Sequence, residues 1–185
     1  MSSANTKLST VDMVYIALFA VLIAVCAWIS IPSTVPFTLQ TFGVLCALGL
    51  LGGRRATLVI IVYLLLGAIG IPVFSGFRGG LGVLLGTTGG YLLGFLFAAL
   101  GYWLLTSLLG EKPWVRIVGM LLGLFISYAF GTAWFMVVYA NTTGPVGLAT
   151  ALGWCVFPFL LPEAAKTALA IFMVRTLPKR VKAFR

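Results

Sequence analysis

The 185-residue sequence contains no histidine, only three acidic residues and only three cysteines. General acid–base catalysis relies mainly on histidine and carboxyl side chains, so the chain has very little from which to build a catalytic site. A zinc-protease HExxH motif cannot occur without histidine, and no GxxxxGK[ST] segment is present to bind ATP. These absences argue against a membrane protease, phosphatase, transferase or ATPase. We therefore expect no catalytic residue, no bound metal and no cofactor.

Charge is also scarce, because 8% of the residues are charged while 62% are hydrophobic and 14% aromatic. The mean hydropathy is +1.17. Long apolar runs with so few charges are typical of an integral membrane protein. No hydrophilic stretch is long enough for a soluble domain, so residues 1–185 are expected to form a single membrane domain. Cys26, Cys46 and Cys155 lie far apart in apolar segments and are interpreted as small core residues.

Prolines, glycines and polar residues divide the apolar sequence into an all-α bundle of six expected membrane-spanning helices. Ser9 or Thr10 is expected to cap the first of them, and a short interfacial helix is expected near 148–155. The second and third helices are short for a span of about 17–25 residues. Either they extend further, or re-entrant outer loops shorten them around a cavity, which is the interpretation we favour. The expected helices are residues 12–29, 39–51, 56–69, 81–109, 114–139 and 159–177.

The net charge of +9 is distributed in short clusters at the ends of the apolar segments, which is a topology signal and not a nucleic-acid-binding surface. With six spans, ten of the twelve basic residues fall on one side, while Arg78 lies on the other and Lys166 lies within a span. The positive-inside rule makes the richer side cytoplasmic and places both termini there. The ten are Lys7, Arg54, Arg55, Lys112, Arg116, Arg175, Lys179, Arg180, Lys182 and Arg185.

Glu163 and Lys166 stand three positions apart within an apolar segment, and this pair is the most informative feature of the chain. A charge at the centre of a spanning helix costs about 2.5–3.5 kcal/mol on insertion scales. At this spacing both side chains lie on one helix face, so they can pair and can point at one ligand. The alternative is a structural ion pair that fixes helix packing. Both residues are expected in the outer half of the membrane, in a pocket capped by loops 31–38, 70–80 and 141–158.

Other polar residues near the outer ends of the helices are candidates for the same pocket. Arg78 could bind a carboxylate in bidentate fashion or could simply be an exposed solubilising residue. Gln40 could contact a ligand or a loop backbone. Thr88 and Tyr91 belong to a glycine-rich helix start that suits an anionic or carbonyl group. The full set of candidate ligand-binding residues is Gln40, Arg78, Gly80, Thr88, Tyr91, Asn141, Glu163 and Lys166.

Small residues form two regular stripes. Ala17, Ala20 and Ala24 lie on the first helix, where the small-xxx-small spacing could pack inside the bundle or against another membrane protein. In the fourth segment, glycines recur every fourth residue as far as Gly94 and Ala98, for which helix packing is the favoured interpretation. Most aromatic residues near the outer helix ends are attributed to the ordinary interfacial belt, and one or two could stack on a bound ring.

Three segments resemble the BioY family, the biotin-specific substrate-binding subunits of energy-coupling factor (ECF) transporters. They are SIPSTVPFTLQTFGVLCALGLLGGRRA, GIPVFSGFRGGLGVLLGTTGGYLLGF and PFLLPEAAK. The family usually has proline where this sequence has Thr87 and often has aspartate where it has Glu163. The second difference keeps the charge and lengthens the side chain.

The resemblance implies a six-helix bundle in the bacterial plasma membrane that binds biotin in an outward-facing pocket. It also implies docking, through Ala17, Ala20 and Ala24, on a membrane coupling subunit driven by two ATPases, although some members are thought to function without the ATPases. Glu163 could accept from the ureido N–H groups, Lys166 could donate to the ureido carbonyl, and Arg78 or Thr88 could bind the carboxylate. The alternatives are a subunit for another vitamin, a stand-alone secondary transporter, and a membrane interaction protein without a ligand.

Overall fold

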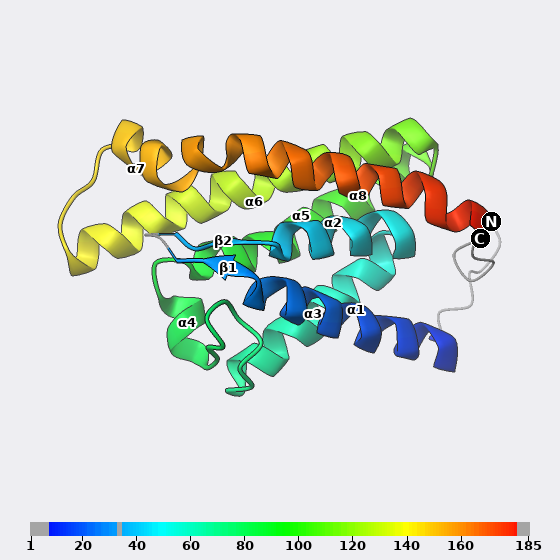
Figure 1. Cartoon of the computed structure of the whole chain (residues 1–185), viewed down its shortest axis with the longest axis horizontal. Coiled ribbons are helices and arrows are strands. Elements are labelled where there is room, and N and C mark those ends of the chain that lie inside the picture. The colour runs from blue at the N-terminus through cyan, green and yellow to red at the C-terminus, as the bar shows by residue number, and fades with distance from the viewer. Residues whose placement is uncertain (1–7, 33–34, 181–185) are drawn as a thin grey trace.

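The computed structural model of the protein describes residues 8–32 and 35–180, which form an elongated helical bundle (Figure 1). The helices are α1 (Thr10–Trp28), α2 (Gln40–Leu51), α3 (Gly53–Ala68), α4 (Leu81–Leu85), α5 (Gly89–Leu109), α6 (Pro113–Thr142), α7 (Leu148–Cys155) and α8 (Leu160–Arg180). A single 3-10 turn, η1 (Phe157–Phe159), precedes α8. Two short antiparallel strands, β1 (Ser30–Ile31) and β2 (Phe37–Thr38), connect α1 to α2. All the expected helices except residues 81–109 correspond to one helix whose bounds agree within three residues.

We predicted a continuous helix over residues 81–109 from the sequence, and this prediction was wrong. Gly86 has an extended backbone, with φ −74° and ψ 179°, and ends α4. Trp134 Nε1 on α6 donates to the Gly86 carbonyl at 3.0 Å, so the carbonyl freed by the break is satisfied. The chain then turns so tightly that a Cβ on Gly89 would lie 1.8 Å from the carbonyl oxygen of Leu84. Only glycine fits at this position, and the break opens space at the start of α5.

Glycines let α5 and α6 approach closely and form an antiparallel hairpin. A Cβ on Gly90 would lie 2.2 Å from Trp134 Cβ, and one on Gly94 would lie 3.0 Å from Ser127 Cα. Ala98 continues the same buried stripe. The four-residue spacing of small side chains therefore serves helix packing, as expected for Gly94 and Ala98.

The remaining helices form a second group. Helix α8 packs along α2, α1 packs on α2 and α3, and α3 also contacts α5. The start of α1 and the end of α8 lie at the same end of the bundle (Figure 1). There, Ser9 caps α1 through a reciprocal capping box with Asp12, and Asp12 pairs with Arg55 at the start of α3 at 2.7 Å. Of the basic residues assigned to this end, Lys7, Lys182 and Arg185 lie outside the described residues.

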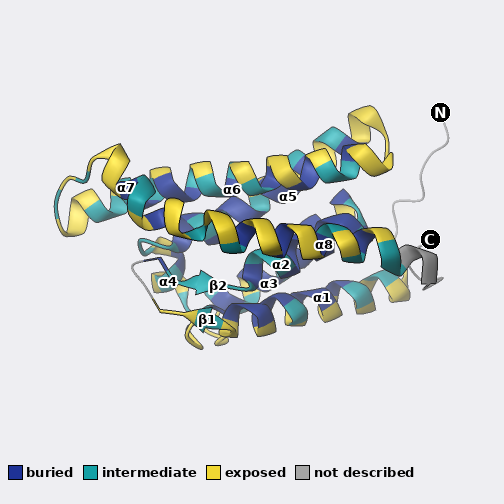
Figure 2. Ribbon diagram, turned by 45° about the horizontal axis from the view of Figure 1, so that its top comes forward, coloured by how far each residue is buried: buried dark blue, intermediate teal, exposed yellow. Residues whose placement is uncertain are grey.

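The surface of the bundle is strongly apolar. Leu161 is 83% exposed and Leu108 is 73% exposed, and exposed positions recur along the outer faces of the helices (Figure 2). Within the described part of the chain, four stretches are long and apolar enough to cross a membrane: α1, α5, α6 and Leu148–Leu177. Helix α2 is a shorter apolar helix. Length, composition and exposed apolar surface together indicate a multi-pass helical membrane protein.

The alanine stripe of α1 divides between the interior and the exterior of the bundle. Ala20 and Ala24 are buried in the core that α1 forms with α2 and α3, at 2% and 4% exposure, whereas Ala17 is exposed. Of the two interpretations of this stripe, packing inside the bundle therefore holds for Ala20 and Ala24. The prediction that these two residues form an accessible docking surface is corrected accordingly, because the chain's own helices already cover them.

We expect Ala20→Trp to lower the free energy of unfolding by about 1–3 kcal/mol, because an indole cannot fit into the packed interface without displacing its neighbours. Ala17→Trp is the matched control, since the same side chain is added on the same helix at an exposed position, with an expected change within about 0.5 kcal/mol. Thermal melts of both variants in detergent make the comparison. A wild-type melting temperature for Ala20→Trp would contradict the burial of this face.

Candidate functional site

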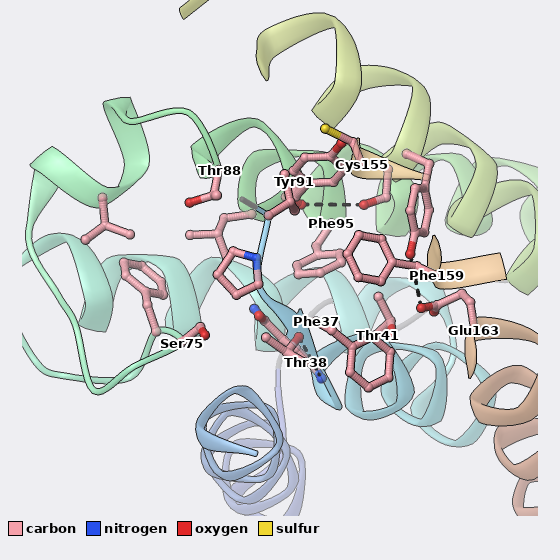
Figure 3. Close-up of a pocket in the computed structure, with 18 of the residues that line it drawn as sticks. Phe37, Thr38, Thr41, Ser75, Thr88, Tyr91, Phe95, Cys155, Phe159 and Glu163 are labelled. Atoms are coloured by element: carbon pink, nitrogen blue, oxygen red, sulfur yellow. Dashed lines mark hydrogen bonds between the residues drawn. The ribbon is translucent and has the colours of Figure 1, made fainter. Parts of the chain in front are cut away.

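A pocket lies in the half of the bundle away from the Asp12–Arg55 pair, beside the strands β1 and β2 (Figures 1 and 3). It comprises about 720 Å³ of empty space, part of which is open solvent at its mouth. Its walls come from residues 35–38, the start of α2, the loop after α3, the start of α5, the middle of α6 and the start of α8. Six candidate residues line it: Gln40, Arg78, Thr88, Tyr91, Glu163 and Lys166.

Glu163 and Lys166 form the ion pair that their spacing predicts. Lys166 Nζ lies 2.5 Å from Glu163 Oε2, and the two side chains are only 7% and 6% exposed. Both face the pocket from the first two turns of α8. The pair is therefore both a buried ion pair and part of the pocket wall, so the structural and the ligand-binding interpretations are compatible.

All three N–H groups of the Lys166 ammonium already have acceptors in the protein. Besides Glu163 Oε2, they are the carbonyl oxygen of Thr38 at 2.9 Å and the hydroxyl oxygen of Thr41 at 2.7 Å. An ammonium has three donors and no acceptor. A ligand can take a hydrogen bond from Lys166 only by displacing one of these contacts. A direct bond from Lys166 to a ligand carbonyl thus remains a prediction without support from these contacts.

Glu163 differs from Lys166, because one of its carboxylate oxygens has no hydrogen-bond partner among the described residues. Oε2 accepts from Lys166 and, at 3.1 Å, from the hydroxyl of Tyr128 on α6. Oε1 is buried and has no hydrogen-bond partner among the described residues. A buried carboxylate oxygen without a donor costs free energy. Glu163 lines the pocket, and this buried oxygen is an acceptor without a donor among the described residues.

Aromatic rings lie near this acceptor, and contacts within the protein limit which of these rings can stack on a ligand. Lys166 Nζ lies 4.5 Å from the centroid of the Phe37 ring. Phe37 also stacks on Phe159, with 5.9 Å between centroids and an interplanar angle of 12°. The Phe37 ring therefore contacts η1 and α8 as well as lining the pocket. Figure 3 shows Phe37, Phe159, Thr41 and Glu163 gathered on one side of the pocket.

The opposite side of the pocket carries hydroxyl groups and a cation. Ser75 and Thr88 lie on this side in Figure 3, away from Glu163. Arg78 is exposed, lines the pocket and donates from Nε to the carbonyl oxygen of Ser75 at 3.2 Å. The pocket thus has the Glu163 carboxylate at one end and hydroxyl donors, with the positive charge of Arg78, at the other.

Two further candidates line the pocket but also bond within the protein. Gln40 Nε2 donates to the hydroxyl of Tyr63 at 2.9 Å, and that hydroxyl donates to the carbonyl oxygen of Val73 at 3.1 Å. Gln40 therefore connects α2 to the loop after α3. The hydroxyl of Tyr91 pairs with that of Thr132 at 3.0 Å, so Tyr91 presents mainly its ring to the pocket.

The structure does not bring Gly80 and Asn141 into the pocket wall. Gly80 precedes α4 with a φ of +95°, and its N–H donates to the carbonyl oxygen of Gly67 at 2.6 Å. Asn141 is exposed near the end of α6. The sequence placed both residues in outer loops, but only some residues of these loops line the pocket.

Several pocket residues were missed by the sequence analysis. Thr38 and Thr41 flank Gln40 in the VPFTLQT segment, so their proximity to a candidate was a usable signal. Tyr128 is one of many aromatic residues in an apolar helix, and nothing in its sequence context distinguishes it. Cys155, expected as a core residue, is fully buried and free but also lines the pocket.

A loop-capped pocket with a buried ion pair, built into a multi-pass helical bundle, defines a membrane protein that binds a small polar ligand. The chain belongs to the BioY family, whose model matches residues 2–183. It is 39% identical to "Biotin transporter BioY2" of Lactococcus lactis subsp. cremoris, over 97% of this chain and 98% of the relative.

Two further comparisons agree with this assignment. The chain is 46% identical to "Biotin transporter BioY" of Thermotoga maritima, over 65% of this chain and 71% of the relative. Among solved structures, it is similar to the crystal structure of the S-component for biotin from an ECF-type ABC transporter. That match has a TM-score of 0.81 at 26% identity and covers 97% of this chain and all of the other.

Proposed function

We propose that this chain binds biotin in the described pocket and takes it up across the membrane as the biotin-specific S component of an ECF-type transporter. The observation that carries the proposal is the buried Oε1 of Glu163, which has no partner among the described residues, at one end of a pocket with Arg78 near the other. Biotin has the matching polarity, with ureido N–H donors at one end and a carboxylate at the other. The ureido ring would lie against Glu163, and the carboxylate would lie towards Arg78 and Thr88.

The chain itself would hydrolyse no ATP. A membrane coupling subunit and two ATPase subunits would supply the energy, in the plasma membrane of a bacterium. The similar solved structure, an S-component for biotin from an ECF-type ABC transporter, supports these partners. The exposed side of α1, which includes Ala17, is the remaining candidate for contact with the coupling subunit.

Titration of the purified chain with biotin, beside thiamine and riboflavin, tests the proposal. We expect saturable one-to-one binding of biotin alone. Binding of another vitamin in its place would favour the alternative S component. Uptake by cells that express the chain with and without a coupling module separates an ECF subunit from a stand-alone transporter, whose uptake would follow the proton gradient instead.

We also propose six membrane spans with both termini in the cytoplasm, supported by the basic residues at one end of the bundle and the pocket at the other. Single cysteines introduced on a cysteine-free background, one before α1 and one near Lys112, are expected to react only from the cytoplasmic side. A cysteine at Gly76, in the loop after α3, is expected to react only from outside. Labelling of the first two positions from outside would overturn this topology.

A further inference from the structure

Tyr128 reaches the buried ion pair from a different part of the bundle. Helix α6 packs against α5, whereas α8 packs along α2. The hydrogen bond from the Tyr128 hydroxyl to Glu163 Oε2, at 3.1 Å, crosses between these two groups of helices. The carboxylate is therefore held both from its own helix, by Lys166, and from α6.

These contacts make the two oxygens of the carboxylate unequal. Oε2 accepts from Lys166 and Tyr128, while Oε1 is buried without a partner among the described residues. The terminal torsion of a glutamate side chain has a broad preference, so covalent geometry alone does not fix which oxygen points where. Two donors on Oε2 do fix it. The Tyr128 ring is itself held edge-on by Tyr91, with 6.0 Å between centroids and an interplanar angle of 77°.

We propose that Tyr128 is a positioning residue of the ligand site, whose hydroxyl holds the Glu163 carboxylate so that Oε1 is the oxygen presented to a ring N–H of the ligand. The inference rests on the proposed function, because it names biotin as that ligand. Tyr128 acts through Glu163 and does not itself bond to the ureido ring. Thr41 acts in the same way on the other side of the pair, since it fixes the Lys166 ammonium.

A ligand comparison tests this role without disturbing the fold. Wild-type protein and Tyr128→Phe are each titrated with biotin and with two derivatives methylated at one or the other ureido nitrogen. Tyr128→Phe keeps the ring and removes only the hydroxyl. We expect it to bind biotin about tenfold more weakly, the effect of roughly one hydrogen bond. For the derivative that cannot donate a hydrogen bond to Glu163, Tyr128→Phe and the wild-type protein should have nearly the same affinity.

Tyr91→Phe is the matched control, because its hydroxyl pairs with Thr132 and not with Glu163. Any loss it causes should be equal for biotin and for both derivatives. If Tyr128→Phe lowered the affinity for all three ligands equally, Tyr128 would act by packing or direct contact, and the proposal would be overturned. No loss of affinity for any ligand would overturn it as well. If Tyr128→Phe does not fold, Thr41→Val must show the same selective loss. Wild-type protein that fails to bind biotin would instead refute the proposed function, and this inference with it.

Discussion

Replacing Lys166 with methionine is expected to lower the free energy of unfolding by about 3–5 kcal/mol, the cost of breaking a buried ion pair by removing one partner. Among the described residues, the substitution leaves the Glu163 carboxylate with the Tyr128 hydroxyl as its one donor. It also removes the donors to the Thr38 carbonyl on β2 and the Thr41 hydroxyl on α2, so α8 loses these two hydrogen bonds to neighbouring elements. Thermal or denaturant unfolding in detergent, without ligand, measures the effect.

The double variant Glu163→Leu/Lys166→Met is the control for this prediction. Exchanging a whole buried ion pair for apolar side chains is often neutral or stabilising. We expect the double variant to recover most of the stability lost in Lys166→Met and to show no biotin binding. If the single variant melts like the wild type, the pair does not stabilise the fold.

Glu163→Gln is expected to weaken biotin binding by about 10- to 150-fold while leaving the fold intact. The amide keeps the shape of the side chain and one acceptor oxygen, but the charge is lost. Hydrogen bonds to charged groups contribute about 1.5–3 kcal/mol, and 1.4 kcal/mol corresponds to a factor of ten in affinity. Lys166 and Tyr128 both donate hydrogen bonds to this side chain, so the single amide oxygen is expected to accept from them. The ligand then loses its acceptor.

Calorimetric titration with biotin, beside a melt without ligand, checks this result. Gln40→Glu, on the facing helix α2, is a useful comparison because it adds a carboxylate to the same pocket while Glu163 and Lys166 are both retained. Unchanged affinity in Glu163→Gln together with a lower melting temperature would assign the pair a purely structural role.

The central pair could be predicted because two charges in an apolar segment are costly, and helical spacing alone brings them to one face. The helix bounds were predictable for the same kind of reason, since runs of apolar residues end at prolines and glycines. The break at Gly86 was not predicted, although the segment is rich in glycine, because it involves Trp134 of α6, which bonds the freed carbonyl.

Other features of the site depend on tertiary packing and could not be read from the chain. The strands β1 and β2 are two residues long, too short for a periodic pattern. The partners of Lys166 at positions 38 and 41 lie more than a hundred residues away in sequence. Ala20 and Ala24 have the spacing of a docking motif, yet which neighbour covers them is decided by how α1 packs on α2 and α3.

The division of the bundle into an α5–α6 hairpin and an α2–α8 group has a thermodynamic consequence. The pocket takes its walls from both, so a bound molecule touches both and adds contacts that neither group makes alone. Occupancy is then linked to the stability of the whole chain, with a gain of about 2.7 kcal/mol when free ligand reaches a hundred times its dissociation constant. The rise in melting temperature with ligand concentration thereby reports how tightly the pocket binds the ligand.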